Sequence, residues 1–332
     1  MMKRLSVFDL FLLAILVSGM LRPFSFLGDP GLGWHLRNGE LIMLSAEVPS
    51  IDPFLHPSAG AWVNTQWLAD VLFARILAAG GEGLLYVTTL FGALVILSLL
   101  YDAVRRAKGV GPGGALVASI LISLCIFAQW ITRPVLLSFF LFFSVWALVR
   151  PLTFPDARRP GMMLTALLPA LFALWANLHP GFALGWVLLG IAWSTVLFAR
   201  YFEDRKGALL GWLTLQIPLC VLATLLNPSG ITLHQTIFGL LTDEKFQNLN
   251  IEWLSPDIRI GFFAPFYLIL LTCIVAGAWG KTSSNLNRQS MSWFDWGVLL
   301  FFAFIALVSR RYIPFFGIVA ALPLALVFTP PL

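Results

Sequence analysis

The feature that most constrains this chain is a succession of apolar stretches, each close to the length that crosses a lipid bilayer. A helix needs about 20 residues to cross roughly 30 Å of hydrocarbon. We place such stretches at 6–22, 83–104, 113–131, 134–150, 162–177, 182–200, 207–226, 262–280, 293–309 and 312–329. The sequence therefore predicts an all-α integral membrane protein with about ten transmembrane helices.

Composition supports the same class. The 332 residues are 59% hydrophobic and only 11% charged, whereas soluble domains are about a quarter charged. The three cysteines lie far apart inside apolar stretches, a pattern with neither disulfide nor metal-site spacing. We treat 1–332 as one polytopic membrane domain with no separate soluble domain.

The distribution of charge predicts the orientation. With the N-terminus in the cytoplasm, the predicted inside segments hold 13 of the 21 basic residues and carry a net charge of +7, against −2 outside. Both termini are then cytoplasmic. The overall net charge of +5 is explained by this asymmetry, so we expect membrane lipids as partners and no nucleic acid.

Two long segments are predicted outside, at about 23–82 and 227–261. The first contains two apolar stripes at helical spacing, and 231–242 contains a third amphipathic stretch. The two stretches of the first segment are too short and too polar to span, so we expect them to be surface helices in the membrane interface. The two stripes of the first segment are Leu32, Leu36, Gly39 and Met43, and Leu68, Val71, Leu72 and Ile76.

Arginines on the external side oppose the positive-inside bias. Arg133 precedes Pro134 at a helix end, and Arg310-Arg311 precede the last span. They are candidates for binding an anion such as a lipid phosphate. The alternative is that they extend to lipid headgroups.

The external acids, histidines and tryptophans also allow structural readings. Asp29 is placed to cap a helix that starts near Gly31, and Asp52 before Pro53 is typical of a turn. His179 sits in a short turn where it could make local hydrogen bonds. Trp34 could anchor the chain at the interface or stack on a sugar ring.

The external motifs resemble those of bacterial polytopic membrane proteins related to the GT-C glycosyltransferases. That family opens its first external loop with an Asp-Pro-Asp-x-Trp-Trp-His-Leu-like motif. The counterparts here are Asp29–Leu36, Ile51–Phe54, Trp62–Leu68, Thr132–Pro134, Trp175–Gly181, Leu226–Gly230, Glu252-Trp253 and Arg310–Pro314, in order along nearly the whole chain.

The resemblance implies sugar transfer from a polyprenyl-phosphate-linked donor at the external face of the bacterial inner membrane. Carried over by motif, Asp29 is the expected catalytic base, and Arg133, Arg310 and Arg311 would hold the donor phosphate. These roles suit the chemistry, because a departing phosphate needs nearby cations and a hydroxyl acceptor needs a base within reach. The expected sugar or acceptor pocket comprises Trp34, His35, Asp52, His179 and Glu252.

The chain departs from the motif at two positions. Gly31 stands where the second acid would be, and Gly33 replaces the first of the paired tryptophans. Loss of that acid weakens the case for a divalent cation, and we expect no other cofactor. It also leaves open a non-catalytic subunit of a membrane complex with protein partners.

A lipid or solute transporter is a further alternative. Transporters place their polar residues near the membrane midplane, whereas here they gather at one face.

Overall fold

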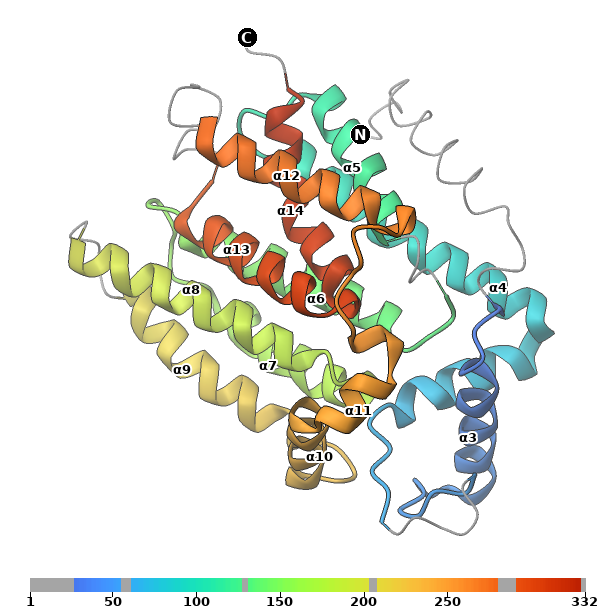
Figure 1. Cartoon of the computed structure of the whole chain (residues 1–332). Coiled ribbons are helices and arrows are strands. Elements are labelled where there is room, and N and C mark those ends of the chain that lie inside the picture. The colour runs from blue at the N-terminus through green and yellow to red at the C-terminus, as the bar shows by residue number, and fades with distance from the viewer. Residues whose placement is uncertain (1–26, 55–60, 127–130, 203–207, 280–290, 330–332) are drawn as a thin grey trace. The chain divides into compact units, whose positions relative to one another are not determined.

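The computed structural model describes residues 27–54, 61–126, 131–202, 208–279 and 291–329. The predicted span 6–22 lies outside these residues. The helices are α3 (Leu32–Ser45), α4 (Trp67–Arg105), α5 (Pro112–Ile126), α6 (Val135–Val149), α7 (Met162–Leu178), α8 (Phe182–Phe202), α9 (Ala208–Ala223), α10 (Ile231–Thr242), α11 (Glu244–Leu249), α12 (Ala264–Trp279), α13 (Trp293–Val308) and α14 (Ile313–Val327) (Figure 1).

The predicted all-α membrane fold is confirmed. Among the described residues, four helices are long and apolar enough to cross a membrane: Trp67–Arg105, Val135–Thr153, Phe182–Phe202 and Arg310–Val327. Shorter apolar helices lie on the predicted spans at Pro112–Ile126, Met162–Leu178, Leu209–Ala223, Gly261–Gly277 and Trp293–Val308. The total of about ten spans stays a prediction.

Helix α4 joins a predicted surface helix to a predicted span. Its path is broken at Gly80 and Gly81, and Gly81 has a φ of +66°. That left-handed conformation is one that glycine adopts without steric cost. The break at Gly80 and Gly81 therefore separates the predicted surface stretch from the predicted span at 83–104.

The chain divides into two compact units. Unit 1 comprises 1–23, 90–130 and 250–332. At its centre is α14, which is buried from Ile313 to Leu326 and packs against α5, α12 and α13. At one end of α14, the Thr329 hydroxyl accepts a hydrogen bond from the Gly111 N–H at 3.0 Å.

Unit 2 comprises 24–89 and 131–249. Helices α7, α8 and α9 run side by side in Figure 1, and α6 packs against both α7 and α8. Helices α7 and α8 pack closely at Gly185 of α8, where a Cβ would lie 2.8 Å from the rings of Phe172 and Trp175. Unit 2 also contains α3 and the first part of α4, where most of the predicted site residues lie.

Both predicted amphipathic helices are present, as α3 and the first turns of α4. On α3 the buried residues are Leu32, His35, Asn38, Gly39 and Ile42, while Leu36 and Met43 are half-buried. On α4 the buried residues of the first turns are Ala69, Asp70, Phe73 and Ala74. Leu36 and Ile76 of the two apolar stripes pack against a cluster of Leu32, Phe73 and Leu85, so the helices meet through apolar residues as well as through polar side chains and a glycine.

Candidate functional site

The site begins with a close approach of two helices. A Cβ on Gly39 of α3 would overlap the backbone carbonyl of Asp70 on α4 and lie 2.8 Å from the Ala74 Cβ. Only glycine permits this approach. It brings the polar residues of α3 within hydrogen-bond reach of the Asp70 side chain, which is fully buried.

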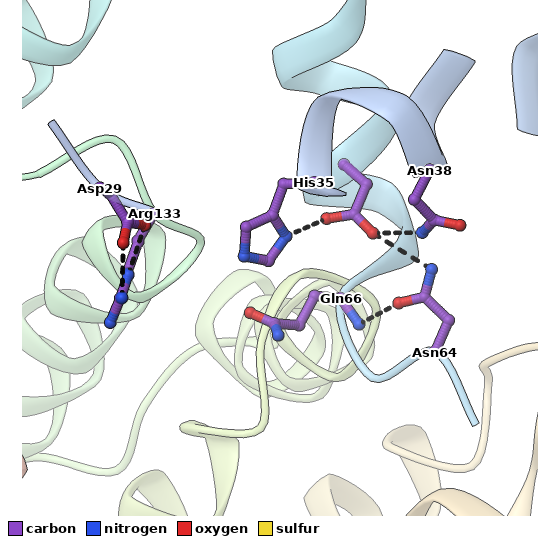
Figure 2. A network of polar contacts seen from close by, with 7 residues as sticks. Asp29, His35, Asn38, Asn64, Gln66 and Arg133 are labelled. Atoms are coloured by element: carbon purple, nitrogen blue, oxygen red, sulfur yellow. Dashed lines mark hydrogen bonds and ion pairs between the residues drawn. The ribbon is translucent and has the colours of Figure 1, made fainter. Parts of the chain in front are cut away.

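Asp70 is the centre of a polar network (Figure 2). Its Oδ1 lies 2.6 Å from Nδ1 of His35. Its Oδ2 accepts hydrogen bonds from the amide of Asn38 at 2.5 Å and from the amide of Asn64 at 3.1 Å. The Asn64 side-chain oxygen in turn accepts the backbone N–H of Gln66 at 2.9 Å. A buried carboxylate is stable only when its oxygens are hydrogen-bonded, and these three donors meet that need.

Aromatic rings cover His35. The Trp34 ring stacks on the imidazole with centroids 3.9 Å apart, and the Trp62 ring meets Trp34 edge-on at 6.5 Å. His35 is only 4% exposed, whereas Trp34 is 36% exposed. Trp34 therefore has one ring face against the network and enough exposed surface to contact another molecule.

Asp29 and Arg133 form an ion pair that draws together two segments far apart in the sequence (Figure 2). Arg133 donates from Nε to Oδ2 at 2.5 Å and from its Nη2 to Oδ1 at 2.6 Å. This two-point geometry is the strongest that a guanidinium makes with a carboxylate. The Asp29 side chain is fully buried and that of Arg133 is 27% exposed.

The ion pair lowers the pKa of Asp29. Burial raises the pKa of this carboxyl, but the hydrogen bonds from Arg133 and Gly31 and the positive charge of Arg133 outweigh burial. The resulting pKa is below the ordinary value of 3.8. Asp29 is therefore ionised at neutral pH and is a weak proton acceptor while Arg133 holds it.

Asp29 is not the N-cap residue of α3, but its side chain bonds the residue that is. Asp29 Oδ1 accepts the Gly31 N–H at 3.1 Å, and Gly31 occupies the N-cap of α3 with no side-chain cap bond. Asp29 thus shapes the turn that leads into the helix. Asp52 does the same before Pro53, since its Oδ1 accepts the Phe54 N–H at 2.8 Å.

The residues around Asp29 do not fit a divalent cation. Both Asp29 oxygens are bonded to Arg133, and Gly31 supplies no second carboxylate. In the part of the chain that the structure describes, no three His, Cys, Asp or Glu side chains are grouped so that they could hold a metal ion. The guanidinium of Arg133 occupies the place on Asp29 where a cation would bind.

His179 makes the local hydrogen bonds that the turn requires. Its Nδ1 accepts the Gly181 N–H at 2.9 Å and lies 2.8 Å from the Ser138 hydroxyl, which also accepts the Trp175 indole N–H at 2.7 Å. The neighbouring Asn177 accepts the Trp67 indole N–H at 2.8 Å. This motif therefore ties the α7–α8 turn to the start of α4.

Glu252, Arg310 and Arg311 lie in unit 1, where the segment 252–255 contacts the turn between α13 and α14. The Ser309 hydroxyl donates to the Glu252 carbonyl at 3.1 Å. Arg310 donates to the backbone carbonyls of Leu254 and Ser255 at 3.3 and 3.4 Å. The Arg311 guanidinium lies 4.1 Å from the centroid of the Trp253 ring, a cation–π contact. That these residues act together with Asp29 and Arg133 stays a prediction.

The sequence analysis did not single out Asp70, Asn38 or Asn64. A signal was present in the sequence. His35 and Asn38 are three residues apart on one helix face, and Asp70 is the one acid in an otherwise apolar turn of α4. The sequence alone does not show that Gly39 brings these two helix faces together.

No model of a known protein family matches the chain, and no curated protein is similar in sequence. Solved structures are similar in fold. The chain matches the oligosaccharyltransferase AglB of Archaeoglobus fulgidus, solved with an inhibitory peptide and a dolichol-phosphate, with a TM-score of 0.58 and 12% identity over 97% of this chain and 50% of that one. The same archaeal oligosaccharyltransferase in its apo form gives a TM-score of 0.59 at 14% identity, covering 96% of this chain and 50% of that one.

ArnT of Cupriavidus metallidurans, bound to undecaprenyl phosphate, matches with a TM-score of 0.51 and 13% identity over 97% of this chain and 58% of that one. AglB and ArnT are GT-C-type polytopic membrane glycosyltransferases. The resemblance expected from the sequence is therefore confirmed at the level of the fold. The chain spans about half the length of the solved AglB structures that it matches.

Proposed function

We propose that this chain is a glycosyltransferase of the bacterial cytoplasmic membrane. It would transfer a sugar from a polyprenyl-phosphate-linked donor to an acceptor at the external face. The observation that carries the proposal is the pair of buried, fully bonded carboxylates, Asp29 and Asp70, in the first external segment of a GT-C-type fold. Burial of a charged side chain costs free energy. Buried charges in a membrane protein therefore indicate a candidate functional site.

The chemistry follows from the donor. An acceptor hydroxyl attacks the anomeric carbon, the bond from that carbon to the phosphate oxygen breaks, and the anomeric centre inverts. The lipid phosphate leaves with the electron pair, so cations must stabilise it, and a base must take the hydroxyl proton. We assign Arg133, Arg310 and Arg311 to the phosphate, and Trp34, His35, Asp52, His179 and Glu252 to the sugar or acceptor pocket.

The ion pair with Asp29 weakens the attraction of Arg133 for a phosphate. Asp29 neutralises Arg133, so a phosphate that approaches the guanidinium also meets a carboxylate. A lipid phosphate bound at Arg133 would therefore need at least one further cation.

The experiment uses the full chain in lipid nanodiscs with a panel of undecaprenyl-phosphate and undecaprenyl-diphosphate sugars. Mass spectrometry measures release of the free lipid phosphate or diphosphate and transfer of the sugar to water or an added acceptor. Turnover of one donor by the wild-type chain is expected. No turnover of any donor, together with no retention of undecaprenyl phosphate in native mass spectra, would refute the proposal.

Matched arginine variants give the control. Arg133→Gln is expected to weaken retention of undecaprenyl phosphate at least about tenfold, which is the effect of losing one charge-assisted contact worth roughly 1.4 kcal/mol. Arg37→Gln removes an exposed arginine that pairs with Glu40 on α3, and its retention should match that of the wild type. Because Arg133→Gln leaves Asp29 buried without its cation, the double variant Asp29→Asn/Arg133→Gln checks the result in a chain with neither charge.

A non-catalytic subunit is the second candidate, favoured by the fact that Arg133 engages both oxygens of Asp29. That candidate predicts undecaprenyl phosphate retention without turnover of any donor. It also predicts that a pull-down from native membranes recovers a partner transferase.

A further inference from the structure

We propose that His35 is the group that takes the acceptor proton, and that Asp70 is the positioning residue that makes His35 able to do so. This inference rests on the proposed function, because it names the base for that transfer. It departs from the sequence analysis, which gave the role of base to Asp29 and no role to Asp70.

The first argument is the tautomer of His35. An ionised carboxylate accepts hydrogen bonds only, so the 2.6 Å contact between Nδ1 and Asp70 Oδ1 requires a proton on Nδ1. In a neutral imidazole the lone pair is then on Nε2. In Figure 2 the second ring nitrogen of His35 lies on the side of the ring opposite the dashed contact. Within the described part of the chain, no hydrogen bond to it is found.

The second argument is the rigidity of Asp70. Its Oδ2 is held by amides from two different segments, Asn38 on α3 and Asn64 before α4. The carboxylate cannot turn without breaking both bonds, so the imidazole that it holds is also fixed. When Nε2 takes a proton, the buried negative charge 2.6 Å away stabilises the imidazolium.

The third argument compares His35 with Asp29. Both Asp29 oxygens are bonded to Arg133, so proton transfer to Asp29 would first have to break a two-point ion pair. Imidazole ordinarily titrates nearest to neutral pH of all side chains and is the commonest general base. Of the two groups, His35 has the available lone pair.

The fourth argument is the setting of the ring. The Trp34 ring stacks on His35 and is partly exposed, and the Trp62 ring contacts the Trp34 ring edge-on. Aromatic faces of this kind suit the apolar face of a sugar ring. A sugar on Trp34 would bring its hydroxyls close to the buried imidazole edge.

The proposed transfer forms one bond and breaks one bond at the anomeric carbon. The acceptor oxygen forms a bond to the anomeric carbon while the bond from that carbon to the donor phosphate oxygen breaks. The hydroxyl proton moves to Nε2 of His35, and the lipid phosphate keeps the electron pair and its negative charge. The proton then passes from the imidazolium to solvent or to the departing phosphate.

The experiment measures kcat and KM against pH, from pH 5 to 9, for the wild type, His35→Gln and Asp70→Asn. His35→Gln is expected to lower kcat by about 10²–10⁴-fold and to remove the acid limb of the profile. Asp70→Asn should lower kcat with little change in KM and move the acid limb to lower pH, because the imidazolium loses its carboxylate. Glu40→Gln, an α3 carboxylate whose side chain is 42% exposed, is the matched control.

Chemical rescue separates catalysis from folding. In His35→Ala, added imidazole should restore part of kcat, and substituted imidazoles should do so in the order of their basicity. The inference is overturned if His35→Gln keeps the wild-type acid limb, or if imidazole rescues nothing in a His35→Ala chain that melts like the wild type. In either case an active wild type leaves the proposed function standing, whereas an inactive wild type refutes both.

Discussion

At the scale of single residues, the two buried acids Asp29 and Asp70 differ in the side chains that bond their carboxylates. Arg133 bonds both oxygens of Asp29, and His35 and two amides bond both oxygens of Asp70. Two acids in one segment that is predicted to be external are therefore distinguished by their partners. One is paired with a permanent cation, and the other with a side chain that can gain or lose a proton.

The lowered pKa of Asp29 predicts how stability changes with acid. A carboxylate whose pKa is lower in the folded chain contributes stability above its unfolded pKa, and this is lost as pH falls through the folded value. The melting temperature of the wild type should therefore fall relative to that of Asp29→Asn/Arg133→Gln below about pH 4. A difference between the two chains that stays constant down to about pH 3 would contradict the assignment.

The loss of the second acid at Gly31 predicts a test of metal binding. A Cβ at Gly31 would lie 3.3 Å from Asp29 Oδ2, so a carboxylate there would stand beside Asp29. Gly31→Asp/Arg133→Gln, which adds that acid and removes the guanidinium, should bind Mn²⁺ at least about tenfold more tightly than the wild type. Electron paramagnetic resonance of free Mn²⁺ measures this without any activity assay. Tight Mn²⁺ binding by the wild type that Asp29→Asn removes would contradict the account.

At the scale of elements, the sequence predicted where the helices lie but not the polar contact between two of them. Apolar length located the helices, and 231–242 coincides with α10. The apolar stripes of α3 and α4 supply Leu32, Leu36 and Ile76 to one hydrophobic cluster, while Gly39 and Asp70 add a polar contact. Periodicity identifies which residues share a helix face. It does not show that a buried carboxylate with three donors will accompany an apolar seam.

The close approach at Gly39 predicts a sensitive position. Gly39→Ala would force α3 and α4 apart, because the new Cβ overlaps the Asp70 carbonyl. The bonds from His35 and Asn38 to Asp70 should then lengthen, and the melting temperature should fall by several degrees. Gly33→Ala is the matched control on the same helix, since a Cβ there meets nothing within 4 Å. Equal melting temperatures for the two variants would show that the contact is looser than described.

At the scale of the whole molecule, the fold was predictable because a bilayer leaves few choices for a chain with this hydropathy. The pairing of Asp29 with Arg133, 104 residues apart, was not predictable. No periodicity relates the two positions, and only the packing of unit 2 brings them together.

The orientation in the membrane is testable with single cysteines, because the native Cys125, Cys220 and Cys273 are buried. Ser50→Cys lies in a predicted external segment, and Arg158→Cys in a predicted cytoplasmic loop; both positions are exposed. A membrane-impermeant maleimide should label the first in intact spheroplasts and the second only after lysis. The reverse pattern would place the Asp29 and Asp70 networks on the cytoplasmic side.

The most direct test of the central claim is a cryo-electron microscopy structure of the full chain in nanodiscs with undecaprenyl phosphate. The account predicts a phosphate whose oxygens lie about 3 Å from the Arg133 guanidinium, on the side of unit 2 that carries Trp34 and His35. A phosphate bound away from both Arg133 and His35, with the two networks covered by the chain's own side chains, would contradict it.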